Sequence, residues 1–296
     1  MINYVEMLKK KIEDSSLIEV AKKLGVVPGT INRWILLNNI PKQYIFDLHE
    51  MCELEINYEN FSYREKDQFF TPDSTSEICV NLFKEKMKEL GENLDDYTFI
   101  EPAVGSGSFF RLFPENRRIG IDIEPRIEGT IKQNYLKWTP ENVDKKYIVL
   151  GNPPFGLRGN LALRFIEHSS HFSEYVAFIL PQFFESDGRG TPKKRIKNMS
   201  PILSERINSV FEYPDGVEVQ VNVIFQIWSK KHLKNSIDKK SCDSYLKIFS
   251  LSDGGTPGTT RNKKWINKCH FYLPSTCFGV ENMKTLNSFE DLPGKK

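Results

Sequence analysis

Between residues 97 and 181, short apolar segments alternate with longer segments, and this alternation limits the folds open to the chain. The segments predicted as strands are 97–102, 118–123, 146–152 and 175–181, with a later one at 221–228. Helices are expected at 76–90, directly after the glycines at 105–107, between the second and third strands, and at 161–172. Strands that alternate with helices form mainly parallel sheets. The pattern therefore predicts an α/β fold built on a doubly wound, Rossmann-like sheet.

A glycine-containing turn follows the first predicted strand, in the sequence EPAVGSGSFF. Gly105 and Gly107 let the backbone turn sharply and approach a ligand without a Cβ in the way. The second strand ends at Asp122, near the spacing at which an acidic side chain accepts hydrogen bonds from a ribose in doubly wound nucleotide sites. The sequence lacks the full G-x-G-x-x-G phosphate loop, which fits a nucleoside ligand without a pyrophosphate.

The third predicted strand is followed by Asn152, Pro153, Pro154 and Phe155. Parallel strands share a direction, so these residues are expected at the sheet edge where ligands bind, beyond the carboxyl ends of the strands. Asn152 offers a carbonyl acceptor, and Pro153 fixes the chain so that a nearby peptide carbonyl is rigidly aimed. The two acceptors suit both hydrogens of an exocyclic amino group, and Phe155 offers a ring face on which a base can stack.

These motifs resemble those of the S-adenosylmethionine-dependent DNA amino-methyltransferases that methylate N6 of adenine, over roughly residues 66–230. The quartet at 152–155 resembles the catalytic motif of that family, and the order of the motifs resembles its gamma arrangement, which has a C-terminal target-recognition region. The family usually has aspartate at position 134, and an amide oxygen there can still accept a hydrogen bond from the cofactor's adenine amino group. The resemblance implies that the cofactor is held by Phe70, Thr71, Pro72, Glu101, Pro102, Ala103, Gly105, Gly107, Asp122, Ile123, Asn134, Tyr135 and Asn152.

The resemblance implies transfer of a methyl group to N6 of an adenine that is flipped out of DNA and stacked on Phe155. It also places Trp228 at a family position whose aromatic ring packs against the flipped base, although a tryptophan that ends a strand is more often a core residue. RNA guanine-N2 and protein-glutamine methyltransferases carry a similar quartet, and cytosine N4 is a further possible acceptor, although that group more often has serine in place of Asn152. A non-catalytic DNA-binding regulator with a methyltransferase-like core is the alternative of a different class.

The first 58 residues predict an all-α region. Apolar residues at helical spacing within 17–24 are followed by Gly25, and a second helix is expected to begin near Pro28 or Thr30. This helix–turn–helix unit resembles those of phage-repressor-like DNA-binding domains. Asn32 and Arg33, on the exposed face of the second helix, are candidates for contact with bases or phosphates. A helical bundle used for packing or dimerisation is the alternative.

Charge is unevenly distributed along the chain, although the net charge is only +2. Residues 1–60 contain 7 Lys/Arg and 9 Asp/Glu, residues 61–180 contain 15 and 18, and residues 181–296 contain 19 and 12. The last third is therefore expected to face a polyanion, with a solvated basic surface as the alternative. Its candidate DNA contacts are Lys193, Lys194, Arg195, Lys263 and Lys264.

The sequence thus predicts three domains: a helix-turn-helix domain at 1–60, a methyltransferase domain at 61–230, and at least part of a small β-rich target-recognition region at 231–296. The β-rich character is expected from the segments 245–252 and 269–276, while 186–199 and 253–264 read as surface loops. DNA is the expected partner, and the sequence leaves open a cognate restriction enzyme, the recognised site and the oligomeric state.

Several classes of protein are not favoured. No apolar run approaches the roughly 20 residues of a membrane helix, and the N-terminus has no signal-peptide pattern. The five cysteines never occur as CxxC, which favours reduced thiols in a cytoplasmic protein. His168 and His171 are read as surface or packing residues, so no metal is expected.

Overall fold

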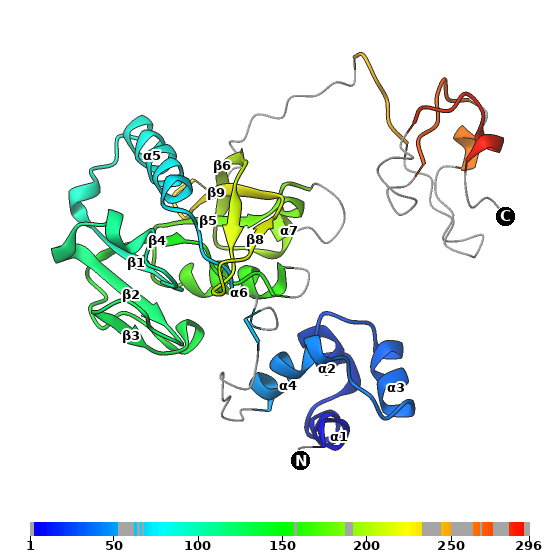
Figure 1. Ribbon diagram of the computed structural model, residues 1–296, viewed down its shortest axis with the longest axis horizontal. Helices are drawn as coiled ribbons and strands as arrows, with labels where there is room; N and C mark the ends of the chain where they lie inside the picture. Colours follow the sequence, from blue (N-terminus) through cyan, green and yellow to red (C-terminus); the bar gives the residue numbers. More distant parts are fainter. Residues whose placement is uncertain are drawn as a thin grey trace. The chain divides into compact units, whose positions relative to one another are not determined.

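The computed structural model describes residues 3–52, 62–63, 66, 68–156, 159–186, 192–232, 244–249, 263–266, 268–274 and 284–292 (Figure 1). The chain divides into two compact units, residues 1–237 and 238–296. Within the first unit the buried apolar side chains form two separate clusters, one in the N-terminal helices and one around a β-sheet. In the described part of the chain, no helix is long and apolar enough to cross a membrane.

The N-terminal helices are α1 (Tyr4–Asp14), α2 (Leu17–Lys23), α3 (Pro28–Leu36) and α4 (Ile45–Met51), with a 3-10 turn η1 (Lys42–Tyr44) before α4. Side-chain caps start the first two helices, because Asn3 accepts from the backbone N–H of Val5 and Ser16 accepts from that of Glu19. The helix pair α2 and α3 lies where the periodicity predicts it, and Trp34 on α3 is buried.

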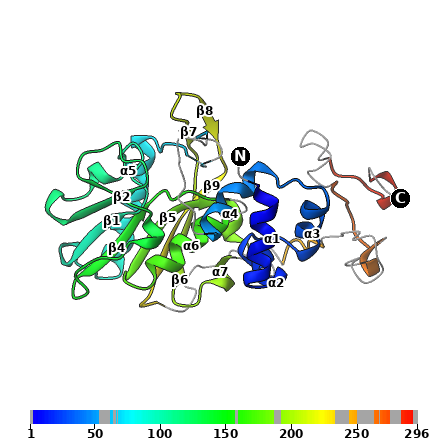
Figure 2. The same ribbon diagram turned by 90° about the horizontal axis from the view of Figure 1, so that it is seen from below.

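A seven-stranded sheet forms the centre of the rest of the first unit, and Figure 2 shows its strands side by side. The strands are β1 (Tyr97–Glu101), β2 (Arg118–Asp122), β3 (Thr130–Lys132), β4 (Lys146–Gly151), β5 (Tyr175–Pro181), β6 (Ser200–Ile207), β7 (Val210–Glu212), β8 (Glu218–Gln220) and β9 (Val223–Ser229). The order in the sheet is β3-β2-β1-β4-β5-β9-β6, and β7 and β8 form a separate hairpin. The strands predicted from sequence are confirmed as β1, β2, β4, β5 and β9.

The sheet has a topological switch point between β1 and β4. From β1 the chain continues outward to β2 and β3, and from β4 it continues in the opposite direction to β5, with all of these pairs parallel. Ile100 pairs with Val149, so the carboxyl ends of β1 and β4 lie next to each other. In open α/β sheets this is the place where ligands bind.

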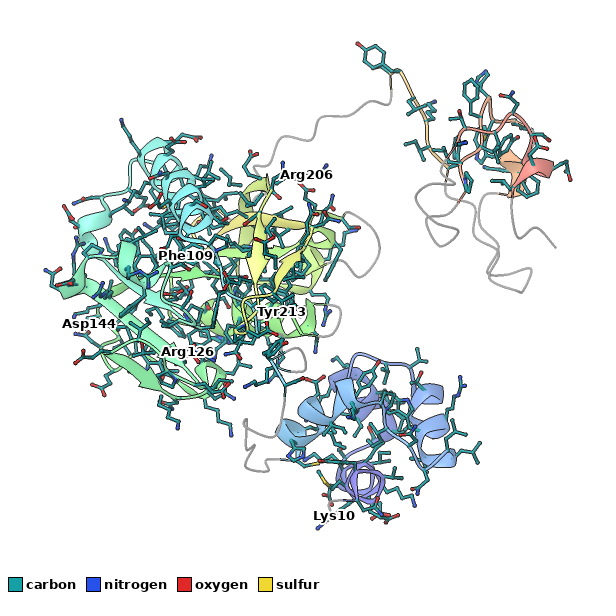
Figure 3. All side chains as sticks on the ribbon, viewed as in Figure 1. Lys10, Phe109, Arg126, Asp144, Arg206 and Tyr213 are labelled. Atoms are coloured by element: carbon teal, nitrogen blue, oxygen red, sulfur yellow. The ribbon has the colours of Figure 1, made fainter. Side chains whose placement is uncertain are left out.

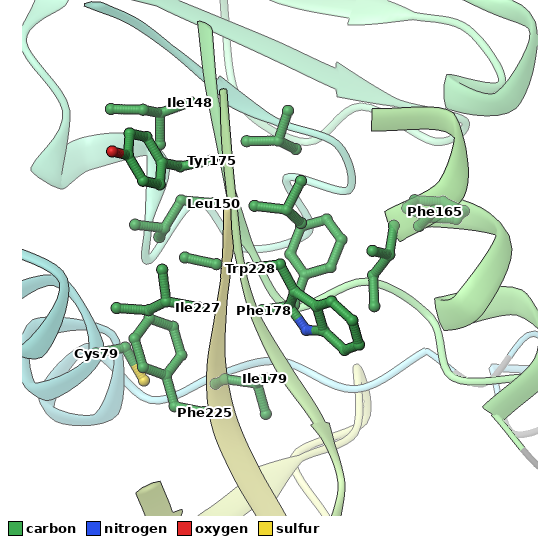
Figure 4. Packing of buried hydrophobic residues seen from close by; sticks show 14 of the residues in the cluster. Cys79, Ile148, Leu150, Phe165, Tyr175, Phe178, Ile179, Phe225, Ile227 and Trp228 are labelled. Carbon is green, nitrogen blue, oxygen red and sulfur yellow. The ribbon is translucent and has the colours of Figure 1, made fainter. Parts of the chain in front are cut away.

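Helices cover both faces of the sheet. Figure 4 shows Cys79 of α5 (Asp73–Glu89) on one side of the strands and Phe165 of α6 (Asn160–Ser169) on the other. The central strands are buried on both faces, and β4 and β5 accordingly consist almost entirely of apolar residues. Burial of each large apolar side chain contributes about 1.5–3 kcal/mol, so this cluster is the main source of stability of the α/β region.

Strand β9 runs antiparallel to β5 and to β6. Trp228, near its carboxyl end, pairs with Val176 of β5, which pairs with Val149 of β4. Its side chain is fully buried beside Phe178 in the core (Figure 4). Trp228 is therefore a core side chain in this structure, as expected for many tryptophans that end a strand, and its contact with a substrate base stays a prediction.

Two of the expected helices do not form, both within the described segment 68–156. After the glycine turn the chain forms only the 3-10 turns η4 (Phe110–Leu112) and η5 (Glu115–Arg117), and between β2 and β4 it forms β3 and η6 (Tyr135–Lys137). Pro114 ends the first segment, and Pro125 and Gly129 interrupt the second, so neither can continue as a helix. The predicted loop at 186–199 contains the short helix α7 (Pro192–Arg195), and η3 (Leu94–Asp96) and η8 (Gln182–Glu185) are further 3-10 turns.

The C-terminal unit has little regular structure in its described residues. They contain the 3-10 turns η9 (Lys263–Trp265) and η12 (Phe289–Asp291) and one isolated bridge between Tyr272 and Leu286. The described residues of 245–252 and 269–276 form no strand, which corrects the prediction of a β-rich region there. The loop predicted at 253–264 lies outside the described residues except at its last two positions.

Candidate active site

The glycine turn after β1 has the backbone conformation that its sequence predicts. Gly105 and Gly107 have φ angles of 52° and 83°, in the left-handed region that favours glycine. A Cβ at Gly107 would lie 2.8 Å from Cγ1 of Ile127, so no larger residue fits without displacing its neighbours. The turn therefore depends on glycine for both its conformation and its close packing.

Asp122, at the end of β2, holds this turn in place. One of its carboxylate oxygens accepts from the N–H of Gly105 at 2.8 Å, and the other accepts from the N–H of Glu124 at 2.8 Å. The carboxylate is buried, yet each oxygen retains a further lone pair. Glu124 itself is paired with Lys66 at 2.7 Å. Asp122 thus fixes the loop and keeps acceptor capacity for a ligand.

A pocket opens at the carboxyl ends of β1 to β4, next to the switch point. It is lined by Pro102, Ala103, Asp122, Ile123, Gln133, Asn134, Tyr135, Leu136, Pro154, Leu161 and Phe165. Most of these side chains are apolar, and Asp122, Gln133 and Asn134 supply polar groups. An apolar pocket with a few placed polar groups suits a flat organic ligand.

Asn134 and Tyr135 contribute to this pocket in different ways. The Asn134 side-chain oxygen accepts from the N–H of Leu136 at 2.9 Å, which caps the turn η6 and leaves its second lone pair for another donor. Tyr135 is buried, and its hydroxyl is 2.6 Å from Oγ of Ser169 on α6. Burial raises the pKa of Tyr135, so this phenol remains neutral and serves as part of the pocket wall.

Asn152 follows β4, and the two ends of its side-chain amide differ in their hydrogen bonding. Its Nδ2 donates to Oγ1 of Thr71 at 3.1 Å. Its Oδ1 is buried and, among the described residues, has no hydrogen-bond partner. Pro153 is buried beside it, and Pro154 lines the pocket. A buried acceptor that lacks a donor raises the free energy of the protein alone. A ligand N–H group that donates to this acceptor would therefore bind favourably.

A row of aromatic rings lies behind this amide. Phe155 is 7% exposed, and Phe69 contacts it edge-on at 5.2 Å between ring centroids. Phe69 also contacts Phe211 of β7 edge-on at 5.4 Å. The ring predicted to stack on a base is thus part of a buried, packed aromatic cluster.

The segment 69–72 is fastened to the β7–β8 hairpin. Phe70 pairs with Glu212 through two backbone hydrogen bonds, of 2.6 and 3.2 Å. The Phe70 ring lies over the glycine turn, because a Cβ added at Gly105 would be 3.4 Å from it. Arg126, labelled in Figure 3, lies 5.2 Å from the centroid of the same ring. Phe70 and Thr71 therefore cover the turn and reach Asn152.

Glu101 is the most deeply buried carboxyl group of the site. It is 2% exposed, and its Oε2 has no partner among the described residues. Burial raises its pKa well above the ordinary value, and the nearby Asp122 carboxylate raises it further. Both effects favour the neutral form of the Glu101 carboxyl, which also has a hydrogen bond with the backbone of Phe110.

The predicted DNA contacts are not part of this site. Asn32 and Arg33 are exposed on α3, as expected for a contact surface. Lys194 and Arg195 are exposed on α7, where the Arg195 guanidinium donates to Asn160 at 3.2 Å. Lys264 is exposed, while the side chains of Lys193 and Lys263 lie outside the described residues.

Several residues of the site carry no clear signal in the sequence. Gln133, Leu136, Leu161 and Phe165 line the pocket, and Phe69 and Phe211 support Phe155. Gln133 directly follows β3, and a polar residue after a strand is a signal for the site. However, β3 has only three residues and is too short to recognise from sequence. His168 bonds the carbonyl of Trp138 at 2.7 Å, and no group of three or more metal-ligating side chains occurs in the described residues.

No protein-family model matches the sequence, and no curated protein matches it. Among solved structures, the chain is similar to a provisionally assigned RNA methyltransferase from Pyrococcus horikoshii, at 14% identity and a TM-score of 0.44, over 59% of this chain and 90% of that one. It is similar to magnesium protoporphyrin IX methyltransferase from Synechocystis PCC 6803 with bound SAM, at 9% identity and a TM-score of 0.34, over 78% and 98% of the two chains. It is also similar to the type IIG restriction endonuclease BpuSI, at 12% identity and a TM-score of 0.41, over 79% and 36%. At these values the likeness assigns no function to this chain.

Proposed function

We propose that this protein is an S-adenosylmethionine-dependent methyltransferase that acts on N6 of an adenine flipped out of DNA. The observation that carries the proposal is the buried Oδ1 of Asn152 at the carboxyl end of β4, which has no hydrogen-bond partner within the part of the chain that the structure describes. An exocyclic amino group has the N–H donors that this oxygen lacks. Two prolines follow it and fix the backbone carbonyls nearby.

The residues around the pocket fit the cofactor. Asp122 offers acceptor capacity for ribose hydroxyls, and the free lone pair of Asn134 suits an adenine amino group. The glycine turn has no room for a Cβ at Gly107, and Phe70 covers it as expected for a segment that closes over the cofactor. When bound, S-adenosylmethionine supplies a methyl group on a sulfonium sulfur, which departs as a neutral thioether.

The role of the protein in this reaction is to position the amino group. Oδ1 of Asn152 and the carbonyl oxygen of Pro153 accept its two hydrogens, which draws the nitrogen lone pair out of conjugation with the ring. One proton passes to solvent as the new nitrogen–methyl bond forms, so no strong base is needed. Phe155 supplies a ring face for the flipped base, since a base inside a duplex cannot reach a pocket of this kind.

DNA is the favoured substrate because two features outside the site suit it. Asn32 and Arg33 are exposed on the second helix of the α2–α3 pair, and the last third of the chain is basic. In this proposal the C-terminal third recognises the target sequence, and the helix-turn-helix tethers the enzyme to DNA. The protein acts in the cytoplasm. RNA guanine N2, protein glutamine and cytosine N4 are the rival acceptors, and a non-catalytic regulator is the rival class.

One experiment separates these possibilities. The purified protein is incubated with S-adenosylmethionine carrying a labelled methyl group and, in parallel, with unmethylated duplex DNA, total RNA or a protein extract. Mass spectrometry of digested products then identifies the modified nucleoside or residue. We expect N6-methyladenine in DNA. Label in RNA or protein, or no transfer with intact cofactor binding, would refute the proposed substrate.

Asn152→Ala is the matched variant for this experiment. It removes one predicted cofactor contact but leaves the residues that line the pocket in place, so cofactor binding measured by calorimetry should largely survive. Methyl transfer should fall by at least 100-fold, comparable to the loss of a preorganised transition-state contact. Turnover near that of wild type would remove Asn152 from the mechanism.

A further inference from the structure

The amide of Asn152 needs a second contact that fixes its orientation. An asparagine side chain rotates about χ2 over a broad range, and an acceptor that swings through this range does not hold a substrate nitrogen in one place. In this structure the amide plane is fixed at its other end, where Nδ2 donates to Oγ1 of Thr71 at 3.1 Å. Thr71 is 8% exposed, so water has little access to this bond.

Thr71 is itself held rigidly. Its neighbour Phe70 is paired with Glu212 of β7 through two backbone hydrogen bonds. On the other side, Pro72 caps the start of α5, and its carbonyl accepts from the N–H of Thr75 at 3.0 Å. A hydroxyl on a β-branched side chain between two fixed neighbours has few conformations available.

We infer that Thr71 is a positioning residue that sets the plane of the Asn152 amide and thereby aims Oδ1 at the substrate amino group. The inference rests on the proposed function and adds to it, because the resemblance assigns Thr71 only to closure over the cofactor. Thr71 and Asn152 are 81 positions apart in the chain, and their contact joins the 69–72 segment to the catalytic strand end. The β7–β8 hairpin, through Glu212, supports the same arrangement.

The test uses Thr71→Val, which keeps the shape and removes the hydroxyl, and Thr71→Ser, which keeps the hydroxyl. Thr98→Val is the control, since Thr98 is also buried but lies toward the amino end of β1, away from the site. Methyl transfer to unmethylated duplex DNA is measured at saturating cofactor, with cofactor affinity measured by calorimetry. Loss of one hydrogen bond predicts about a 3- to 10-fold lower turnover for Thr71→Val. Thr71→Ser should recover most of it, and Thr98→Val should match wild type.

Two outcomes would overturn the inference. If Thr71→Val weakens cofactor binding but turnover at saturation is unchanged, Thr71 acts on the cofactor alone. If Thr71→Ser loses as much turnover as Thr71→Val, the hydroxyl is not the cause.

A second readout does not depend on activity. The side-chain ¹H–¹⁵N pair of Asn152, assigned as the one missing in Asn152→Ala, should shift in Thr71→Val and stay in place in Thr98→Val. An unshifted pair would refute the contact. A shifted pair in a protein that methylates no amino group would instead refute the proposed function while leaving the contact established.

Discussion

At the scale of single residues, one planar amide joins two parts of the site. Asn152 donates to Thr71 from one end and, in the described structure, leaves a buried oxygen without a donor at the other. Such an oxygen costs about 1–3 kcal/mol, which the protein recovers only when a ligand donates to it. An alanine or leucine at position 152 would avoid this cost. Ligand binding, and not stability, therefore explains why the residue is asparagine.

Phe155 supports a prediction that separates stacking from packing. Phe155→Tyr keeps a ring face, while Phe155→Leu fills similar space without one. The leucine variant should lose a base contact worth about 1–3 kcal/mol in kcat/KM for DNA, and the tyrosine variant should retain most activity. Because Phe155 is buried against Phe69, thermal unfolding of both variants is the control for packing. Equal kcat/KM for the two would argue against a base on this ring.

At the scale of elements, the glycine turn and the end of β2 act together through Asp122. Asp122→Ala removes the acceptor of the Gly105 N–H and the predicted acceptor of ribose hydroxyls. Loss of hydrogen bonds to a charged group costs about 1.5–3 kcal/mol, so cofactor affinity should fall by ten-fold or more. Asp122→Asn keeps one acceptor oxygen and should show an intermediate loss. Calorimetry that finds unchanged affinity for the alanine variant would move the ribose contact to another residue, with Glu124 the nearest candidate.

A polar cluster joins three strands at the amino ends of β1 and β5. The Glu92 carboxylate accepts from the hydroxyls of Tyr97 on β1 and Tyr175 on β5, and from Lys231 just after β9. Burial alone would raise the pKa of Glu92, but the hydrogen bonds from Lys231, Tyr97 and Tyr175 outweigh it and lower this pKa from 4.5 to about 2. The charged form is therefore the one that the folded state prefers.

This cluster predicts a pH-dependent stability difference. Since the pKa of Glu92 is lower in the folded state, its stabilising effect is complete above about pH 5 and is lost as the pH falls toward 2. Glu92→Gln should lower the free energy of unfolding by about 1.5–3 kcal/mol at pH 7, and by much less at pH 3. Urea unfolding at the two pH values measures this. A difference of the same size at both would show that the charge of Glu92 is not responsible.

At the scale of the whole molecule, α1–α4 have a hydrophobic cluster of their own. We therefore expect that deletion of residues 1–58 leaves a folded protein that binds cofactor and methylates the same DNA sequence, with weaker DNA binding. Replacing Lys193, Lys194, Arg195, Lys263 and Lys264 by glutamine should instead lower both the salt dependence of binding and the activity, because phosphate contacts carry that dependence. Sequencing of the methylated sites made by the truncated protein is the decisive measurement. A changed motif would make the helix-turn-helix the reader of the sequence.

The sequence by itself determined the features that depend on near neighbours in the chain. The apolar runs of β1, β4 and β5, the left-handed glycines at 105 and 107, and the polar residues that follow each strand are all local patterns. Parallel strands share a direction, so local patterns also predicted that Asp122 and Asn152 would meet at one sheet edge.

Only the tertiary structure decided which side chains touch across long stretches of chain. The antiparallel direction of β9 places Trp228 beside Val176 in the core, and strand direction is not written in the alternation of side chains along a strand. Likewise, Thr71 contacts Asn152 in a segment where the neighbouring Phe70 pairs with β7, a strand of only three residues. Contacts of this kind depend on how distant elements pack. The sequence around a hydroxyl or an amide therefore does not show which partner it will contact.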